Sequence, residues 1–286
     1  MIMKIVRYWW TFDGDEELCY LNKEISHGDV HCGHCNRLIV AGENVFELTP
    51  LRKITYYFDE HVQPDKYIVC SSCIEKRIEE VSSYDGVSYE ELIHLLKTVQ
   101  TVEELNSWRY EIGARIPSVY EMFGYNQQNS YHQYDLWEHS LHTVINLPRN
   151  LDDDMLYLAA LLHDIGKPES WCWGKREDDM DMHYYGHPVK SMEIVRDEVI
   201  PCFEVVGVTL LEAEKKRLLY YIEYHDYRMS HREKHLKKHL SIASMDDFRN
   251  LMLLQIADAK AHVQLPAVLE RIRICEEWYQ RVSKME

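Results

Sequence analysis

The stretch Asp152–Pro168, DDDMLYLAALLHDIGKP, indicates how the larger part of this chain folds. Its three leading aspartates suit the positive end of a helix dipole, and apolar residues then recur at helical spacing. Gly166 can cap such a helix at its C-terminal end, and Pro168 cannot continue it. We therefore expect a helix that ends by placing an imidazole and a carboxylate, those of His163 and Asp164, beside a break in the backbone.

Helical patterns continue on both sides of this stretch, from about residue 83 to the C-terminus. Ser88 and Thr101 each precede an acidic residue by three positions and stand before an apolar run, as residues at helix N-termini do. The patterns that follow are separated by short connections. We therefore expect a helical bundle over residues 83–286.

The N-terminal part of the chain differs in composition and is rich in strand formers and turns. Residues 40–45 (VAGENV) have the pattern of a strand, a turn and a second strand, and residues 54–58 (ITYYF) that of a further strand. The fold class that we expect is therefore mainly α, with the helical bundle preceded by a small β-rich module over residues 1–82.

The composition is that of a folded protein, with 46% hydrophobic and 28% charged residues in a chain of 286 residues. The formal net charge of −16 opposes non-specific binding to nucleic acid or to an anionic membrane. One basic stretch, Arg228–His239, is either a solvated face or an edge that contacts anions. No window holds the roughly 20 apolar residues that span a bilayer, and residues 1–12 lack the apolar core of a secretory signal. We therefore expect a cytoplasmic protein.

Four of the eight cysteines form two CxxC pairs with 34 residues between them. In an intracellular chain such pairs indicate a metal rather than disulfides, and two of these turns make a tetrahedral site that suits zinc. A closed site of four thiolates is structural, and the module around it binds nucleic acid, binds protein, or only staples a short segment. We therefore expect one structural zinc ion, in a zinc-ribbon or treble-clef module, held by Cys32, Cys35, Cys70 and Cys73.

Further histidines and an aspartate stand on separate predicted segments around the His163–Asp164 pair. Asp258 interrupts an apolar run, where a buried carboxylate costs several kcal/mol unless a metal ion or a hydrogen-bond donor relieves the cost. Each histidine alone is more typical of a core or surface residue than of a metal ligand. An ordered set over five segments is nevertheless hard to produce by chance, and its other members are His139, His187 and His225.

This ordered pattern resembles the HD-domain superfamily of metal-dependent phosphohydrolases, over about residues 101–286. The stretches QNSYHQYDLWEH (128–139), LLHDIGKP (161–168) and YYGHPVKS (184–191) are most similar to the HD domain that accompanies bacterial tRNA nucleotidyltransferases. The nucleotidyltransferase head has no counterpart, because no Gly-Ser followed by an acidic pair occurs near the N-terminus. The resemblance therefore implies phosphate-ester hydrolysis and does not imply CCA addition.

The resemblance also implies a binuclear metal centre. In the family, the first histidine, the HD pair and the distal aspartate hold one ion, and here these residues are His139, His163, Asp164 and Asp258. Two intermediate histidines mark the binuclear members, in which the HD aspartate bridges both ions, and here they are His187 and His225. Mixed imidazole and carboxylate ligands suit two divalent ions of iron, manganese, nickel, cobalt or zinc.

Two residues are predicted to act in catalysis, Asp164 as the bridging ligand and Lys167 as a cation near the substrate. Lys167 resembles a family position that contacts the substrate phosphate, although a surface lysine at a helix end would have the same pattern. His183 is left out of the site because the Tyr-Tyr-Gly that follows it indicates a loop. Several other residues either line the pocket or pack in the core, namely His132, Gln133, Trp137, His142, Trp171 and Trp173.

We therefore expect a metal-dependent phosphohydrolase, either a phosphodiesterase or a phosphatase, that acts through metal-activated water. The expected substrate is a nucleotide, a cyclic nucleotide or an RNA end. One alternative is a di-iron oxygenase, because some HD-fold proteins with six ligands cleave C–C or C–P bonds with oxygen. Another is a ligand sensor or scaffold without catalysis, whose zinc module binds a partner.

Overall fold

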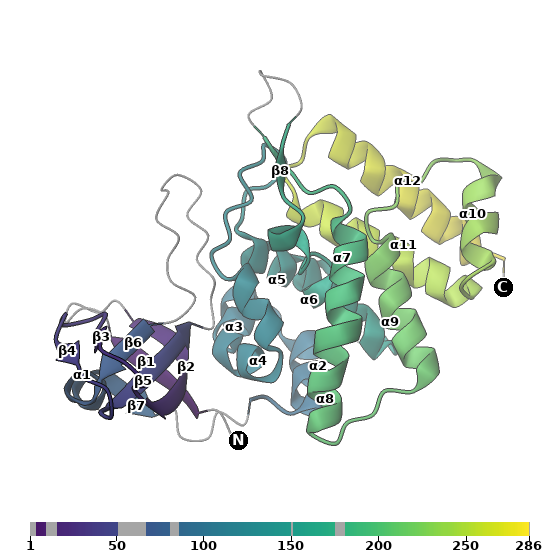
Figure 1. Ribbon diagram of the computed structural model, residues 1–286. Coiled ribbons are helices and arrows are strands. Elements are labelled where there is room, and N and C mark those ends of the chain that lie inside the picture. The colour runs from purple at the N-terminus through teal and green to yellow at the C-terminus, as the bar shows by residue number, and fades with distance from the viewer. Residues whose placement is uncertain are drawn as a thin grey trace. The chain divides into compact units, whose positions relative to one another are not determined.

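The computed structural model describes residues 4–9, 16–50, 67–80, 86–149, 151–174 and 181–285. The chain forms two compact units, Met1–Asp85 and Gly86–Glu286 (Figure 1). Helices dominate the second unit and strands the first, so the predicted mainly α class with a small β-rich part is confirmed. Within the described ranges, no helix combines the length and the apolar character that crossing a bilayer requires.

The first unit is built around an antiparallel sheet of five strands in the order β6-β5-β2-β1-β7. Its described elements are β1 (Lys4–Trp9), β2 (Glu16–Ile25), β3 (Val30–His31), β4 (Leu38–Ile39), β5 (Asn44–Pro50), β6 (Tyr67–Cys70), α1 (Ser71–Arg77) and β7 (Ile78–Glu80). Buried apolar side chains, among them Leu48 and Val69, form one small core together with three of the four paired cysteines. A core of this size is typical of modules that a metal ion helps to stabilise.

A turn lies where the sequence predicts one in this unit. β4 ends at Ile39, β5 begins at Asn44, and Gly42 between them has a φ of +94°, which residues with a side chain rarely adopt. The predicted order of strand, turn and strand is therefore confirmed, although β4 pairs with β3 while β5 pairs with β2 and β6. The strand predicted at 54–58 lies outside the described residues.

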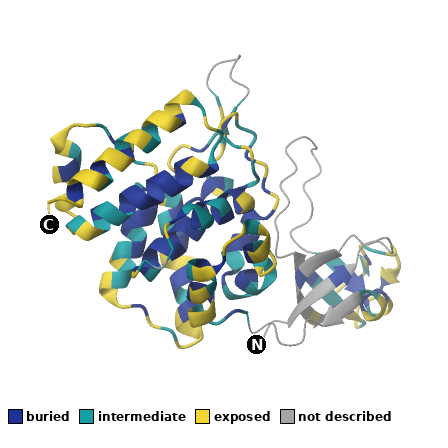
Figure 2. Cartoon of the chain, turned by 180° about the vertical axis from the view of Figure 1, so that it is seen from behind, coloured by how far each residue is buried: buried dark blue, intermediate teal, exposed yellow. Residues whose placement is uncertain are grey.

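The second unit is a helical bundle with α6 at its centre. Its helices are α2 (Tyr89–Thr98), α3 (Val102–Asn106), α4 (Arg109–Arg115), α5 (Leu136–Asn146), α6 (Asp154–Leu162), α7 (His187–Ile194), α8 (Ile200–Val205), α9 (Glu212–Tyr224), α10 (Glu233–Leu240), α11 (Met245–Ala261) and α12 (Pro266–Val282). Shorter elements are the 3₁₀ turns Pro117–Met122 and Lys167–Glu169, the π-helical segment Val195–Val199, and a hairpin of β8 (Cys172–Trp173) and β9 (Met182–His183). Every residue of α6 after the first is buried, because α2, α5, α9 and α11 pack around it. Figure 2 shows the buried residues of this unit gathered at its centre.

Side-chain caps fix where the predicted helices begin. The Ser88 hydroxyl accepts the N–H of Glu91, and the Glu91 carboxylate accepts the N–H of Ser88, so α2 starts with the predicted capping box. Thr101 caps α3 through the N–H of Glu104. Both predicted helix starts are therefore confirmed.

Asp153 caps α6 and ties its start to two other helices. Its carboxylate accepts the N–H of Leu156, the hydroxyl of Tyr221 on α9 at 2.7 Å and the side-chain amide of Asn250 on α11 at 2.8 Å. The side chain is only 6% exposed, so these donors replace the water that a carboxylate otherwise needs. The start of α6 is thereby held against α9 and α11.

The turn after α6 packs directly against α7. We expected Gly166 to cap α6, but its φ of −85° is ordinary and the helix already ends at Leu162, so that prediction is wrong. Space is what requires a glycine here, because a Cβ atom would overlap the backbone of Lys190 and Ser191. The Gly166 N–H also donates to the Ser191 hydroxyl at 2.9 Å. This close contact holds the first turn of α7, and with it His187, beside the end of α6.

Replacing Gly166 with alanine is expected to destabilise the helical unit by about 1–3 kcal/mol, because the added methyl group pushes α7 away from the turn. Urea unfolding, followed by the circular dichroism signal of the helices, measures the effect. Gly28→Ala is the matched control, because the same methyl group meets no atom within 4 Å there. An unfolding midpoint equal to that of the wild type would show that the position of α7 does not depend on this contact.

Candidate metal centres

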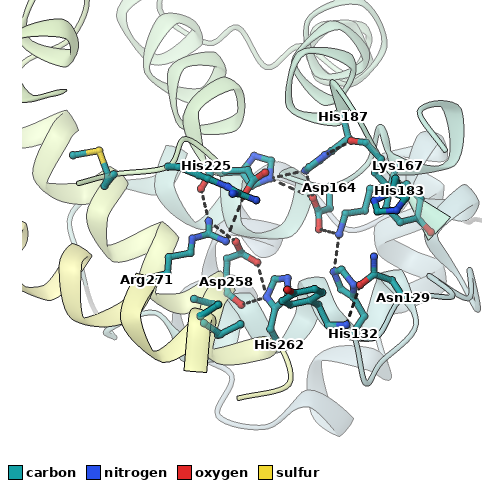
Figure 3. Close-up of a pocket in the computed structure, with 18 of the residues that line it drawn as sticks. Asn129, His132, Asp164, Lys167, His183, His187, His225, Asp258, His262 and Arg271 are labelled. Atoms are coloured by element: carbon teal, nitrogen blue, oxygen red, sulfur yellow. Dashed lines mark hydrogen bonds and ion pairs between the residues drawn. The ribbon is translucent and has the colours of Figure 1, made fainter. Parts of the chain in front are cut away.

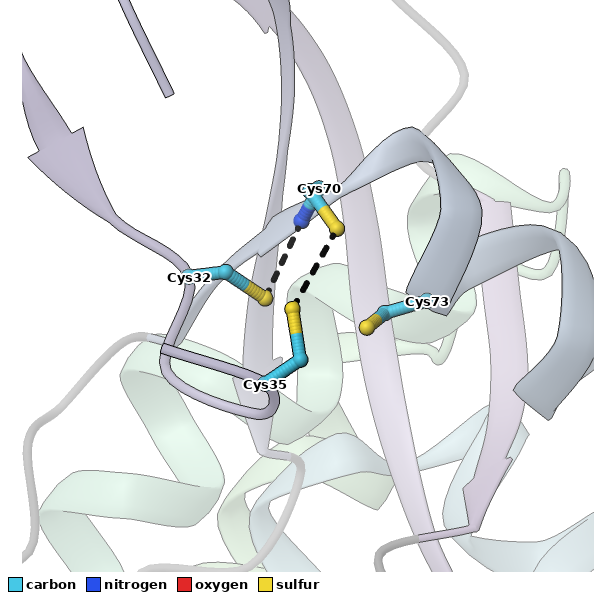
Figure 4. Close-up of side chains that lie close together, drawn as sticks. All are labelled: Cys32, Cys35, Cys70 and Cys73. Carbon is cyan, nitrogen blue, oxygen red and sulfur yellow. Dashed lines mark hydrogen bonds between the residues drawn. The ribbon is translucent and has the colours of Figure 1, made fainter. Parts of the chain in front are cut away.

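The four predicted zinc ligands lie together in the first unit (Figure 4). Cys32 and Cys35 lie in the turn after β3, Cys70 ends β6 and Cys73 lies in α1, and their sulfur atoms are all within 4.8 Å of one another. The Cys35 and Cys70 sulfurs are 3.8 Å apart. A tetrahedron with zinc–sulfur bonds of about 2.3 Å has an edge of about 3.8 Å. The cluster is therefore compatible with a zinc ion.

Hydrogen bonds prepare one of these thiols for metal binding. Burial raises the pKa of the Cys70 thiol, but hydrogen bonds from the Ser72 hydroxyl and the Cys73 backbone N–H outweigh burial and lower the pKa to about 6. The backbone N–H of Cys70 also donates to the Cys32 sulfur at 3.4 Å. Because the thiolate is the form that binds metal, these donors favour ligation.

The second cluster lies in the helical unit, where the six predicted ligands come together around one carboxylate. Figure 3 labels four of them, Asp164, His187, His225 and Asp258. Five separate helices position the six ligands: His139 lies in α5, His163 and Asp164 follow α6, His187 begins α7, His225 follows α9, and Asp258 lies in α11. Each of the six is at most 9% exposed. Two carboxylates buried to this extent require nearby positive charge.

The two oxygens of Asp164 face different pairs of histidines. Its Oδ2 atom is 3.2 Å from His163 Nε2 and 3.4 Å from His139 Nε2. Its Oδ1 atom is 3.1 Å from His187 Nε2 and 3.3 Å from His225 Nε2. Asp258 joins the first pair, with its Oδ1 atom 3.2 Å from His139 Nε2. Asp164 therefore stands between a group of three further ligands and a group of two.

Backbone carbonyls fix the tautomer of three of these histidines. The Nδ1 atoms of His163, His187 and His225 lie 2.9, 2.8 and 2.7 Å from the carbonyl oxygens of the residues three positions earlier. A carbonyl oxygen only accepts hydrogen bonds, so each Nδ1 atom carries the proton. When its Nε2 atom carries no proton, as metal ligation requires, each ring presents the lone pair of that atom to Asp164, which is the arrangement found at metal-ligating histidines.

The facing lone pairs of His187 and His225 repel one another unless a proton or a metal ion lies between them. The Nε2 atoms of His139 and His163 are 3.3 Å apart, and those of His187 and His225 are 3.1 Å apart. Neighbouring ligands of one ion at bonds of about 2.1 Å are about 3.0–3.4 Å apart. The buried Oδ1 atoms of Asp164 and Asp258 receive no hydrogen bond from any described residue. The side chains present thus fit two metal ions that share Asp164.

The pKa shifts show the same demand for positive charge. Burial lowers the pKa of His163, but the Asp164 and Asp258 carboxylates outweigh burial and raise it to about 10. Burial raises the pKa of Asp164, and the charges of His163 and Lys167 outweigh it and hold that pKa well below its usual value. Burial also raises the pKa of Asp258, and the charges of His262 and Arg271 outweigh it and hold that pKa well below its usual value. Both carboxylates therefore remain ionised and attract cations.

Lys167 is a buried part of this cluster and not a surface lysine, so the second of its two interpretations is wrong. Its side chain is 4% exposed, and its ammonium lies 2.6 Å from Asp164 Oδ2. It also donates to Gln127 Oε1 at 2.8 Å and lies 3.0 Å from His132 Nε2. Gln127 is 1% exposed and was not anticipated from the sequence, because no spacing pattern connects it to Lys167.

Two further residues missed by the sequence analysis contact Asp258. His262 Nδ1 is 3.0 Å from the Asp258 backbone oxygen and 3.4 Å from its Oδ1 atom. The position of His262, four residues after Asp258 on one helix, was a signal that could have identified it. Arg271 on α12 pairs with the other carboxylate oxygen at 3.1 Å, and no feature of the sequence pointed to it.

A cavity of about 700 Å³ is lined by Asp164, Lys167 and Asp258. His132 lines it, as does His183, which we had left out as a loop residue. The rest of the wall includes Tyr131, Tyr185 and Arg228. Tyr185 is 66% exposed and its ring lies parallel to that of His183, with the ring centres 5.3 Å apart. Of the further residues considered for the pocket, His132 therefore lines it, while His183, Tyr131 and Tyr185 were not selected from the sequence.

The other aromatic candidates lie elsewhere. Trp137 is buried, donates to the side chain of Asn106 and packs against Phe123, so it belongs to the core. His142 stacks on Tyr134 with ring centres 4.0 Å apart. Trp171 and Trp173 contact each other edge to face and are partly exposed. None of these four, nor Gln133, is among the described residues that line the cavity.

The basic stretch Arg228–His239 divides between its two interpretations. Helix α10 contains most of it, with His239 fully buried and Lys234, Lys237 and Lys238 exposed, as expected of a solvated face. Arg228 instead lines the cavity, so the interpretation as an anion-contacting edge still applies to this residue.

Replacing Cys70 with serine is expected to open the first unit, because metal ligation contributes folding energy to small modules. Limited proteolysis should then cleave residues 1–80 faster than in the wild type, and zinc content should fall by one ion for each chain. Cys202→Ser, in the helical unit, serves as the control. A proteolysis pattern equal to that of the wild type would contradict a structural metal at the four cysteines.

His187→Ala and His139→Ala are expected to remove different ions, because these histidines face different oxygens of Asp164. Elemental analysis after metal loading should show one ion fewer for each variant, with the other ion retained. His142→Ala is the matched control, since it lies on the same helix as His139 and stacks on Tyr134 away from the cluster. Full occupancy in both ligand variants would overturn the two-ion arrangement.

The comparison with known families accords with this geometry. Residues 131–261 match the family model described as HD domain, and all six predicted ligands of the helical centre lie in that segment. No curated protein matches the chain, so the closer resemblance to the HD domain of tRNA nucleotidyltransferases gains no support. Over residues 131–261 the helical unit is therefore similar to HD domains, which are generally metal-dependent hydrolases.

Proposed function

We propose that this protein is a metal-dependent phosphohydrolase with a binuclear centre, acting on a nucleotide, a cyclic nucleotide or an RNA end. One observation carries the proposal: the two oxygens of Asp164 face separate histidine pairs, and Asp164 lines a cavity that Lys167 also lines. Two divalent ions bound there would lower the pKa of a bound water molecule and stabilise negative charge on a phosphoryl group.

The chain's own residues contribute orientation and charge. The backbone carbonyls behind His163, His187 and His225 hold the imidazoles in one tautomer, so the ligand atoms are aligned before any ion binds. Lys167 places a full positive charge 2.6 Å from the proposed bridging carboxylate. An ammonium has three N–H donors, and this one already has three acceptors. A phosphoryl oxygen therefore bonds to Lys167 only by replacing one of them.

The cavity favours a nucleotide among phosphate-containing substrates. Its volume of about 700 Å³ lies within the range of roughly 300–1,000 Å³ typical of small-molecule sites. The exposed ring of Tyr185, held parallel to His183, offers a face on which a base could stack. A polynucleotide end is less favoured, because the chain carries a net charge of −16.

The same six ligands would also hold the two irons of an oxygenase, which is the alternative that the ligand set supports. Lys167 favours hydrolysis over that alternative, because a buried ammonium beside the ligands suits a substrate whose negative charge increases during the reaction. A non-catalytic sensor involves no such increase in negative charge and therefore does not require the Lys167 ammonium beside the ligands.

Wild-type protein loaded with manganese, iron, cobalt, nickel or zinc is expected to hydrolyse a chromogenic phosphodiester or a member of a nucleotide panel. Asp164→Ala should reduce the rate by about 10²-fold or more, because both proposed ions lose a ligand. Asp197→Ala, at an exposed aspartate that pairs with Arg196, is the matched control. Oxygen consumption with a mixed-valent iron signal, in place of hydrolysis, would support the oxygenase instead.

A further inference from the structure

Arg271 on α12 contacts residues of both histidine groups at once (Figure 3). Its Nη2 atom donates to the backbone oxygen of His225 at 2.8 Å and to Asp258 Oδ2 at 3.1 Å. Its Nη1 atom lies 3.4 Å from Asp226 Oδ1. Helix α12 begins at Pro266, beyond the segment that matches the HD domain model. This contact therefore comes from outside the matched segment.

The bond to Asp258 decides which carboxylate oxygen faces the histidines. Because Oδ2 is occupied by the guanidinium, Oδ1 is the oxygen that lies 3.2 Å from His139 Nε2. Without this partner the carboxylate could rotate about its Cβ–Cγ bond and present either oxygen. The guanidinium thus selects the Asp258 oxygen that would bind the ion held by His139, His163 and Asp164, and it fixes the direction in which that oxygen points.

The hydrogen bond to the His225 backbone oxygen restrains a member of the second ligand group, the pair His187 and His225. The His225 carbonyl belongs to the residue whose imidazole faces Asp164 Oδ1, and it lies just past the end of α9, where the helix no longer holds the backbone. A donor at 2.8 Å restrains that carbonyl and therefore the backbone that carries the ring. Asp226, the next residue, is drawn to the same guanidinium.

We propose that Arg271 is a positioning residue that aligns ligands of both metal ions, an inference that rests on the binuclear centre proposed above. A planar guanidinium suits this role better than an ammonium, because its fixed fork directs donors to two acceptors at defined angles. It also gives each buried carboxylate of the centre its own cation, since Lys167 pairs with Asp164 as Arg271 pairs with Asp258.

Calorimetric titration of the metal-free full-length protein with Mn²⁺ tests the proposal without relying on catalysis. Arg271→Ala is expected to weaken binding of both ions by about 10–100-fold, the usual effect of removing a residue that orients metal ligands. Arg271→Lys keeps the positive charge and should recover only part of the affinity. Added guanidinium ion should restore binding to Arg271→Ala by filling the vacated space. The matched control is Arg273→Ala on the same helix, whose side chain is 51% exposed and pairs with Glu270 and Glu277.

The outcomes separate this proposal from its alternatives. Wild-type affinity for both ions in Arg271→Ala would overturn it, and a raised KM with unchanged metal affinity would make Arg271 a substrate contact instead. Loss of affinity for one ion only would limit the role to one group and also contradict the proposal as stated. If the wild type binds two ions but hydrolyses no phosphate ester, the proposed function fails while the Mn²⁺ titrations still decide the role of Arg271. A wild-type helical unit that takes up no ion would overturn both.

Discussion

The requirement that two buried carboxylates be neutralised governs the helical unit. Asp164 and Asp258 are almost fully enclosed, and an unpaired charge in such a place would cost several kcal/mol. Five imidazoles, one ammonium and one guanidinium surround them, drawn from helices far apart in the chain. The packing of α6 against α5, α9 and α11, and of α7 against α9 and the turn after α6, brings these groups to one point.

The C-terminal ends of two helices both position histidines of this centre and fix their tautomers. The last carbonyls of a helix have no partner within it, and a nearby donor must satisfy them. His163 and His225 immediately follow α6 and α9, and each donates through Nδ1 to a carbonyl three positions back. One hydrogen bond therefore gives a carbonyl of the last helical turn its donor. The same bond also sets the tautomer that leaves Nε2 available for metal.

Much of this arrangement could be predicted from local sequence. Apolar periodicity and caps predicted α2, α3 and α6, and the ordered histidines and aspartates predicted the set that converges on Asp164. The residues of the site that could not be predicted from the sequence are those whose roles depend on tertiary contacts. Gln127 and Arg271 act through side chains that meet the site only after folding, and the need for Gly166 comes from the approach of α7 rather than from its own φ. No periodicity within one segment reports such contacts.

The chain separation between the ligands has a consequence for how the two centres relate to folding. Each CxxC pair is local, so an unfolded chain already offers paired thiols to a metal ion. The helical ligands run from His139 to Asp258 and meet only when the bundle has formed. An ion that binds there recognises the native state alone and shifts the folding equilibrium by mass action. Occupancy of the proposed centre would thereby link the heat stability of the helical unit to the concentration of free metal around it.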